Sequence, residues 1–359
     1  MGSSLRVVDE VLTPGPRLLR VLGAAAATVM AILVVAAPAQ AAEEERVGPE
    51  RCGECHKKEY KAWLLSSHST LITDGYDEDV TDEVEQIVEE LDLFDVESEG
   101  ICDVCHYNYY RDVLGEQEIT ATDCEACHGP GAGWVDIHSS FGAENGKQIR
   151  SAADESAEHR GQRVSQSLAL GWRSPTHSTV ALVNQCFVCH LGPDEEIVND
   201  GGHVAGSRID LVSWLSGEIR HNFQRTAQGE NAPLTAERRR VLHIVGRALD
   251  VEHGIRGIAE AYSKGRFMMG LQERIGESLV ELKKVRAEVP LEEVDEIIRL
   301  AESIPLEPGG GSRVKTVSVA DRIHAQVERF AAKHDGSQLA AIDPLITTEV
   351  RGKPATGNE

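Results

Sequence analysis

The sequence predicts a mainly α-helical protein with much irregular structure, in which a cysteine-bearing first part precedes a C-terminal helical bundle or hairpin. Three observations support this fold class. All eight cysteines lie between residues 52 and 190. The same part is rich in Gly, Asp, Glu and Ser, so it cannot bury much apolar surface by itself. After residue 232, by contrast, apolar residues recur at helical spacing.

The N-terminus has the features of a secretory signal peptide. Arg17 and Arg20 precede an apolar run over residues 21–37, and a small-residue A-x-A site ends at Ala41. The run is shorter than the roughly 20 apolar residues that span a bilayer, which disfavours the alternative of an uncleaved anchor. We therefore predict a cleaved signal peptide over residues 1–41. The mature protein should be periplasmic, or peripheral at a membrane surface.

The eight cysteines form four copies of the pattern C-x-x-C-H. In this pattern two thiols bond covalently to the porphyrin of a c-type haem, and the adjacent histidine is the proximal iron ligand. Two zinc sites or four disulfides are alternatives, but neither requires a histidine after every second cysteine. We expect a tetrahaem, multihaem cytochrome c domain over residues 42–229. The predicted attachment residues are Cys52, Cys55, Cys102, Cys105, Cys124, Cys127, Cys186 and Cys189, and the predicted proximal ligands are His56, His106, His128 and His190.

The haem region contains no methionine, because Met1 and Met30 leave with the signal peptide and the other two, Met268 and Met269, lie in the tail. Ligation by methionine, which raises haem potential, is therefore not expected, and each iron should be bis-histidine or five-coordinate with an open face. This predicts low-potential centres. The candidate distal ligands are His68, His138, His159, His177, His203 and His221, of which His159 lies in a polar stretch and should be solvent-exposed.

Four haem macrocycles would supply the core that the haem region lacks. We expect short helices and loops wrapped around them, in a domain whose folding depends on the cofactor. Only 17 residues separate His106 from Cys124, whereas the other motifs lie further apart. Haems two and three should therefore be close neighbours in a tightly packed pair.

Charge divides the mature chain in two. Residues 42–229 contain 36 acidic and 14 basic residues, a net of −22, whereas residues 230–359 contain 21 and 19, a net of −2. We expect redox protein partners with a basic docking surface and no nucleic acid. Part of the acidity is one run, residues 74–99, in which Val84, Ile87 and Val88 recur at helical spacing. This pattern favours a solvated helix with one narrow packed stripe, and a dedicated docking surface is the alternative.

The tail shows three helical patterns before a Gly-rich stretch. Thr235 should cap a helix that carries Val241 and Leu249, a second pattern runs from Leu271 to Val285, and a third follows Pro290. We predict a helical region over residues 230–304, a linker over 305–317, and a C-terminal helix with a frayed end over 318–359. The tail could pack on the haem domain or mediate a homo-oligomer or membrane-associated complex. Its histidines, which we expect to be ordinary surface or packing residues, are His243, His253, His324 and His334.

The first three motifs resemble those of the multihaem, tetrahaem cytochrome c-554-type family, which is related to the electron acceptor of hydroxylamine oxidoreductase. The opening "CGECHKKEYKAWLLSSH" of residues 52–68 is similar to that family's C-x-x-C-H...Y-x-x-W-x-x-S-x-H. The closely spaced second and third motifs, with C-E-x-C-H-G-P-G followed by a histidine, also resemble it. Around the fourth motif the similarity is loose, and the tail has no counterpart.

The resemblance implies three bis-histidine haems and one five-coordinate haem, with histidines exchanged between distant sites. Carried onto this chain, it assigns His138 to the first haem, His68 to the third and His177 to the fourth, and it leaves the second haem open. His203 and His221 exceed this scheme. They could ligate the second haem, replace His177 at the fourth, or serve proton transfer.

Two functional classes follow from these patterns. The first and favoured one is an electron carrier that passes single electrons between redox partners through closely spaced haems. The second is a redox enzyme that acts on a small nitrogen or sulfur compound, such as nitric oxide, nitrite or hydroxylamine, at an open haem. Tyr107, Tyr109 and Tyr110 could line that open face, although packing against porphyrin is the simpler expectation. The absence of a lysine-ligated C-x-x-C-K motif disfavours the enzyme.

Overall fold

The fold of the chain, obtained as a computed structural model, is described for residues 46–70, 78–94, 96, 100–112, 114–144, 146–191, 194–217, 219–221 and 231–352. The predicted signal peptide, residues 1–41, and the last residues of the expected frayed end, 353–359, lie outside the described residues. The described chain belongs to one unit, residues 44–359. Among the described residues, no helix has the length and apolar character needed to cross a membrane.

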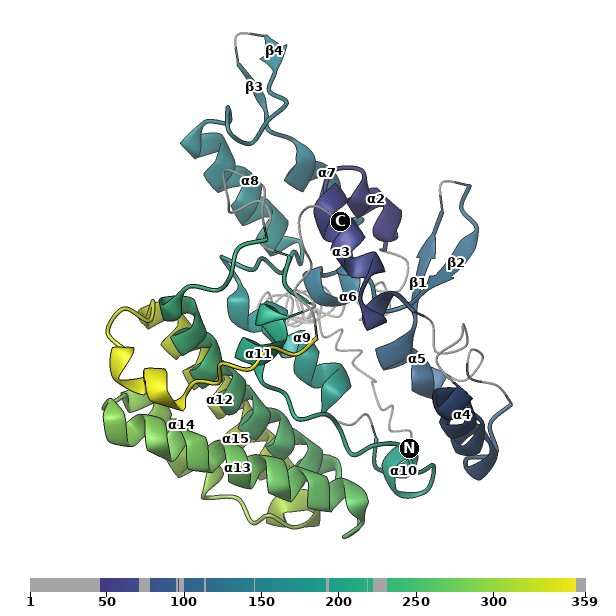
Figure 1. The fold of residues 1–359 in the computed structure, drawn as a ribbon, viewed down its shortest axis with the longest axis vertical. Helices are drawn as coiled ribbons and strands as arrows, with labels where there is room; N and C mark the ends of the chain where they lie inside the picture. The colour runs from purple at the N-terminus through teal and green to yellow at the C-terminus, as the bar shows by residue number, and fades with distance from the viewer. Residues whose placement is uncertain are drawn as a thin grey trace, which may run out of the picture. The chain divides into compact units, whose positions relative to one another are not determined.

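The first half of this unit consists of short helices joined by loops, with two small hairpins (Figure 1). Its strands are antiparallel: β1 (Asn108–Arg111) pairs with β2 (Gln117–Thr120), and β3 (Ala143–Glu144) pairs with β4 (Lys147–Gln148). The helices are α2 (Pro49–Gly53), α3 (Lys57–Leu64), the 3-10 turn η1 (Ser67–Ser69), α4 (Glu78–Glu90), α5 (Gly100–His106), α6 (Cys124–His128), α7 (Val135–Ser139), α8 (Ala157–Ala169), α9 (Thr179–His190), α10 (Glu195–Asn199) and α11 (Leu211–Ser216).

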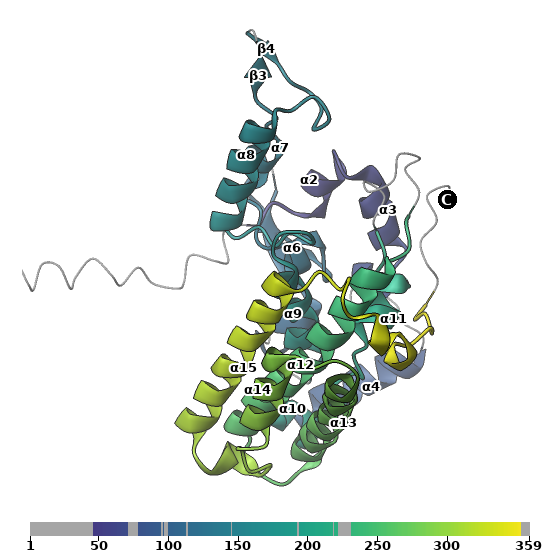
Figure 2. The ribbon, with the colours of Figure 1, turned by 90° about the vertical axis from the view of Figure 1, so that its left-hand side faces the viewer.

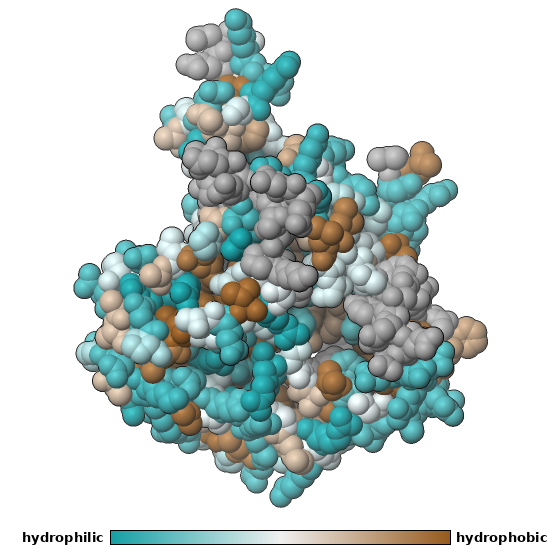
Figure 3. All heavy atoms as spheres, in the orientation of Figure 1, coloured by the Kyte–Doolittle hydropathy of each residue, from teal (hydrophilic) through white to brown (hydrophobic). Residues whose placement is uncertain are grey.

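Longer helices build the C-terminal part. They are α12 (Ala236–Glu260), α13 (Arg266–Glu288), α14 (Glu292–Ala301) and α15 (Arg313–Lys333), with the 3-10 turns η3 (Pro308–Gly311) and η4 (Ala340–Leu345). Helix α12 packs against both α13 and α15, and α14 packs against α15 (Figure 2). The predicted N-cap is confirmed, because the Thr235 side chain accepts a hydrogen bond from the backbone nitrogen of Arg238. The outward face of these helices is mostly hydrophilic (Figure 3).

One continuous apolar core joins α9 and α11 to the C-terminal helices. Before Val180, the buried hydrophobic residues in the described part of the chain are only Ala62, Tyr107, Ala121 and Trp134. The mainly α-helical fold class, with irregular regions and a helical C-terminal part, is thus confirmed. The haem region itself has almost no apolar core.

The structure differs from the predicted helices in two details, both near the start of the C-terminal helix. The C-terminal helix, expected from Ser318, begins at Arg313. Before it, the predicted linker folds into η3, where Gly310 adopts a φ of 58° and is buried against Thr316. In the acidic helix α4, by contrast, Val84, Ile87 and Val88 are half-buried while the neighbouring acidic residues are exposed, as the stripe predicts.

Candidate haem sites

The four C-x-x-C-H motifs lie at or beside the C-terminal ends of four helices. His106, His128 and His190 are the last residues of α5, α6 and α9, and His56 follows the turn after α2. Cysteines three residues apart on a helical turn project to one side, next to the histidine that follows. All eight cysteines are described, and none of them forms a disulfide. The alternative of four disulfides is therefore not what the structure shows.

Each motif histidine faces one histidine from elsewhere in the chain. His56 pairs with His138, with ring centroids 6.1 Å apart and ring planes at 28°. The other pairs have ring planes at 62–73°. Their centroid separations are 6.4 Å for His106 and His203, 6.1 Å for His128 and His221, and 6.0 Å for His68 and His190. We call these pairs sites 1, 2, 3 and 4, in the order of their motifs.

This separation fits an iron atom between the two rings of each pair. A metal–imidazole bond is about 2 Å long, and a ring centre lies roughly 1.2 Å behind its nitrogen, so two axial imidazoles place their centroids about 6.3 Å apart. The observed separations, 6.0–6.4 Å, bracket this value. The residues present therefore fit bis-histidine haem.

At sites 2 and 3, hydrogen bonds orient three of the four rings so that Nε2 is left for the iron. The Nδ1 atom of His128 donates to the Arg173 carbonyl at 3.0 Å, and that of His221 to the Ile219 carbonyl at 2.6 Å. The Nδ1 atom of His203 donates to the Val204 carbonyl at 2.9 Å. Such outer partners fix the ring of a metal ligand and raise its basicity.

A neighbouring chain segment clamps the motif histidine at sites 3 and 4. The backbone nitrogen of Arg173 donates to the His128 carbonyl at 2.8 Å, and that of Ser207 to the His190 carbonyl at 2.7 Å. Glycine is needed where the chains approach. Gly206 has a φ of 87°, and a Cβ atom there would lie 2.2 Å from the Leu191 carbonyl oxygen.

Site 1 has an aromatic surrounding instead of a carbonyl. The His138 ring lies 4.6 Å from the Trp172 ring and 5.5 Å from the Trp134 ring, centroid to centroid. Its Nδ1 atom is buried and makes no hydrogen bond to the described residues. Burial lowers the pKa of His138 to about 4, and it does the same for His128 and His190. These imidazoles are therefore neutral at pH 7, as metal ligands must be.

The sulfur atoms show which motifs adjoin. The thiol of Cys52 lies near enough to that of Cys124 to raise its pKa, which brings sites 1 and 3 together, and α2 packs against α6. The thiol of Cys189 lies near enough to that of Cys105 to lower its pKa, which brings sites 2 and 4 together through α5 and α9. Helix α6 also packs against α9. Motifs two and three also lie close together: Thr122 donates a hydrogen bond to the Cys105 carbonyl at 2.9 Å, and Asn108, just after motif two, donates one to Asp123, just before motif three, at 2.9 Å.

Several apolar side chains close in sequence to the paired histidines are exposed to solvent. A macrocycle held between two imidazoles needs apolar surroundings for its edges and faces, and these side chains could supply them. All five are at least 41% exposed: Leu64, Leu65, Val104, Val188 and Val204. They lie within or beside the second and fourth motifs and the distal ligands His68 and His203.

The pairing departs from the ligand scheme that the resemblance implies. His138 faces the first motif, as that scheme has it. His68, however, faces His190 of the fourth motif instead of the third, because η1 carries it to the end of α9. His177 is exposed just before α9 and pairs with no motif histidine in the described chain. The second motif is not left open, since His203 faces His106.

The other histidines lie away from the four pairs. His159, expected to be solvent-exposed, is half-exposed, and its Nδ1 atom lies 2.6 Å from Oε1 of Glu155. In the C-terminal part, His253 contacts Asn184, His324 contacts Glu252 and His334 contacts Glu293. The fourth, His243, is 4% exposed within α12, and neither of its ring nitrogens has a hydrogen-bond partner in the part of the chain that the structure describes.

Sequence reasoning missed two carboxylates that organise the third motif. The Asp123 side chain caps α6, and burial raises its pKa to about 6. The buried Glu125 carboxylate accepts hydrogen bonds from the backbone nitrogens of Val47, Gly48 and Gly131. It thereby ties the segment before α2 to α6, and so site 1 to site 3. The C-E-x-C-H-G-P-G spacing contained this signal, because the glutamate lies inside the motif.

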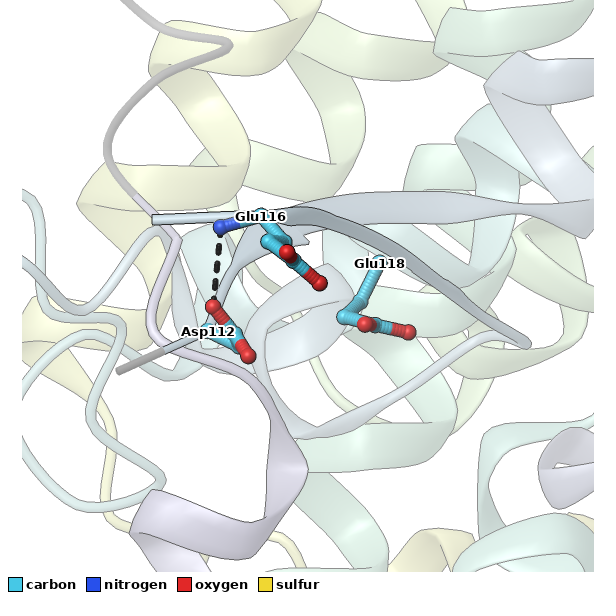
Figure 4. Close-up of side chains that lie close together, drawn as sticks. All are labelled: Asp112, Glu116 and Glu118. Carbon is cyan, nitrogen blue, oxygen red and sulfur yellow. Dashed lines mark hydrogen bonds between the residues drawn. The ribbon is translucent and has the colours of Figure 1, made fainter. Parts of the chain in front are cut away.

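The hairpin after the second motif carries three converging carboxylates. Oxygen atoms of Asp112, Glu116 and Glu118 all lie within 4.8 Å of one another (Figure 4). Asp112 accepts hydrogen bonds from the backbone nitrogens of Leu114 and Glu116, each at 2.8 Å. These contacts form the turn, and the cluster adds to the negative charge of the haem region.

The tyrosines of the same hairpin serve its packing. Tyr107 is buried, and the Tyr109 hydroxyl donates to Asp103 at 3.1 Å. The Tyr110 ring packs against Gly48, whose φ is 80°, because a Cβ atom there would lie 2.5 Å from the ring. Tyr109 and Tyr110 thus tie the hairpin to α5 and to the segment before α2.

Comparison with known proteins places the first three motifs in one family. Residues 51–129 match the family described as cytochrome c554 and c-prime. No curated protein and no solved structure matches the chain. The matched residues include three of the four C-x-x-C-H motifs, so a covalently bound haem c follows. Through residues 51–129, the chain is therefore similar to the cytochrome c554-type family of c-type cytochromes in electron transfer.

Proposed function

We propose that this protein is an exported, periplasmic tetrahaem c-type cytochrome that carries single electrons between redox partners through closely spaced, low-potential haems. The observation that supports this most strongly is the pairing of all four motif histidines with four other histidines, at separations of 6.0–6.4 Å. Haem c, when bound at such a site, supplies reversible one-electron chemistry at its iron.

The protein's own residues would hold and tune the four groups. In each motif two cysteines would tether the porphyrin and the following histidine would bind its iron. The distal histidines His138, His203, His221 and His68 would supply the second imidazole at sites 1 to 4. Hydrogen bonds from His128, His203 and His221 to backbone carbonyls increase imidazole basicity and favour the oxidised state, which supports low potentials.

The adjacency of the sulfur atoms supports short steps between sites. Cys52 adjoins Cys124, and Cys105 adjoins Cys189, so the porphyrins tethered there would have neighbouring edges. Packing of α6 against α9 connects these two groups of sites. An electron entering at one site could therefore reach the other three within the protein.

Charge favours a basic partner. The haem region has a net charge of −22 before the haem propionates are counted. Part of this negative charge is concentrated in the carboxylate cluster of the β1–β2 hairpin. Complementary charge steers association and makes its rate depend on ionic strength. Electron exchange with a basic redox protein should therefore slow as salt is added.

The pairing also separates the two functional classes that the sequence predicts. An enzyme that acts on nitric oxide, nitrite or hydroxylamine at haem needs an axial position that substrate can take. Every motif histidine in the described chain faces a second histidine, which favours electron transfer.

Intact mass spectrometry of the purified native protein tests the proposal. We expect a chain that begins at Ala42 or Glu43 and carries four covalent haems. The double variant Cys124→Ser/Cys127→Ser should lose one haem, whereas His177→Ala, which alters an unpaired histidine, should keep four. Fewer than four haems in the native protein, or zinc in their place, would refute it.

A further inference from the structure

The motif histidine of site 4 is held by a segment that rests on the C-terminal helices. The Oγ atom of Ser207 lies 3.2 Å from Nδ1 of His190, and the Ser207 backbone nitrogen donates to the His190 carbonyl. The carbonyl of the same serine accepts a hydrogen bond from Nη1 of Arg274, in α13, at 2.6 Å. The contact of His190 with Ser207 therefore depends on where α13 places Arg274.

Arg274 is itself fixed by a buried carboxylate of α12. Its Nε atom lies 3.0 Å and its Nη2 atom 2.8 Å from Oδ1 of Asp250, and the Ser278 hydroxyl donates to Oδ2 at 2.7 Å. Arg274 is 7% exposed and Asp250 5% exposed. A buried, hydrogen-bonded ion pair has one geometry, because breaking it leaves an uncompensated charge. The position of the Ser207 carbonyl is thus specified by two helices.

A second contact reaches the same ring from the end of the chain. The Trp214 ring, in α11, lies edge-on to the His190 ring at 4.8 Å, and the Arg351 guanidinium lies 4.9 Å from the Trp214 centroid on its face. The backbone nitrogen of Arg351 also donates to the Ser213 carbonyl. The C-terminal part therefore surrounds His190 through Ser207 and through Trp214.

We propose that the helices α12 and α13 form the outer support of haem site 4, with Arg274 as a positioning residue that acts on His190 through Ser207. The inference rests on the proposed function, since it requires a haem at this site. It gives the C-terminal helices, for which the cytochrome c554-type match offers no counterpart, a role in setting the potential of one haem.

The direction of the effect follows from the hydrogen bond. With Nε2 of His190 on the iron, Nδ1 carries a proton and donates it to the Ser207 hydroxyl. This donation makes the imidazole more basic and stabilises the oxidised iron. Loss or misalignment of the bond should therefore raise the midpoint potential of site 4 and of no other site.

Three variants of the full-length, haem-loaded protein test this. Arg274→Lys keeps the positive charge but loses the fork that holds Asp250 and the Ser207 carbonyl together. Ser207→Ala removes the acceptor itself. Arg240→Lys is the matched control, because Arg240 is 8% exposed and holds Asp343 through two nitrogens and the Gly336 carbonyl through a third, so these bonds run to the end of the chain instead of to Ser207.

A spectroscopic redox titration should show one of four midpoint potentials raised in Arg274→Lys and in Ser207→Ala, and none changed in Arg240→Lys. The double variant Arg274→Lys/Ser207→Ala should shift no further than Ser207→Ala alone, because both act through one bond. If Arg274→Lys does not fold, Ser278→Ala, which removes a donor to Asp250, should shift the same haem by less.

Unchanged potentials in Arg274→Lys or Ser278→Ala, beside a shifted haem in Ser207→Ala, would overturn the role of the helices. Equal shifts of all four potentials, or the same shift in Arg240→Lys, would overturn it as well, because they indicate general loosening. A haem count below four in the parent protein would instead refute the proposed function, so the two failures are distinguishable.

Discussion

The part of the chain before Val180 and the helical part after residue 231 bury apolar surface in different ways. The helical part contributes most of a continuous core that includes Leu242, Ile255 and Leu282. The earlier part has only Ala62, Tyr107, Ala121 and Trp134 buried among its described hydrophobic residues, while Leu65 and Val104 stay exposed beside the histidine pairs. The comparison indicates that haem is the missing interior of the first part.

Sites 3 and 4 also differ in which part of the chain holds the motif histidine. At each, a short segment clamps the motif histidine by a backbone hydrogen bond and by a bond to Nδ1. The segment at site 3, around Arg173, is part of the haem region, whereas Ser207 at site 4 is held by Arg274 of the C-terminal helices. The same pair of hydrogen bonds to a motif histidine is therefore held by the haem region at site 3 and by the C-terminal helices at site 4.

Loss of haem should have the largest effect and should divide the molecule. Replacing all eight cysteines by serine removes covalent attachment, so residues 46–179 should lose structure for want of a core, while residues 231–352 stay helical. Hydrogen exchange followed by mass spectrometry should show fast exchange in the first range and protection in the second. Equal protection in both would contradict the comparison.

A cavity in the C-terminal helices should destabilise the helical part and leave the haem region unaffected. Leu282→Ala empties a fully buried position in α13, and a substitution of this kind costs about 2–5 kcal/mol. Thermal unfolding of the helical part should move to lower temperature, while the optical spectrum of the haems at sites 1 and 3 stays unchanged. Val280→Ala, at a position 51% exposed on the same helix, should leave the unfolding temperature almost unaltered.

Acid should affect the haem region through one buried carboxylate. Hydrogen bonds from Arg163 hold the pKa of Glu155 down, at about 2, against an ordinary value of 4.5. Because the pKa is depressed in the folded state, the stabilisation is complete above pH 4.5 and is lost as pH falls towards 2. In the variant Glu155→Gln, the midpoint of thermal unfolding should drop at pH 6 and depend less on pH in this window. A parallel pH profile for the two proteins would count against the role of Glu155.

Much of this organisation could be predicted from the sequence, because the signals were local. The C-x-x-C-H spacing and the apolar periodicity of α12, α13 and α14 are read within a few turns of chain. The partners of His106 and His190 could not be read this way, since His203 and His68 reach them only through the tertiary fold. For the same reason, the resemblance could not anticipate that His68 faces His190.

Other features depended on contacts that leave no pattern. Ser207 becomes important only because Gly206 lets the chain approach His190, and Arg274 only because α13 lies beside that segment. Asp123 and Glu125 were visible as residues next to and within a motif, but their partners at Val47 and Gly48 lie far away in sequence.

The most direct test of the central claim is the electron paramagnetic resonance spectrum of the fully oxidised protein, with its spins counted against protein concentration. Four bis-histidine sites predict four low-spin ferric signals per chain. Near-parallel rings at site 1, at 28°, should give a rhombic signal, and the steeper angles at the other sites, 62–73°, should give more anisotropic ones. A high-spin ferric signal that cyanide abolishes, or fewer than four spins, would contradict the account.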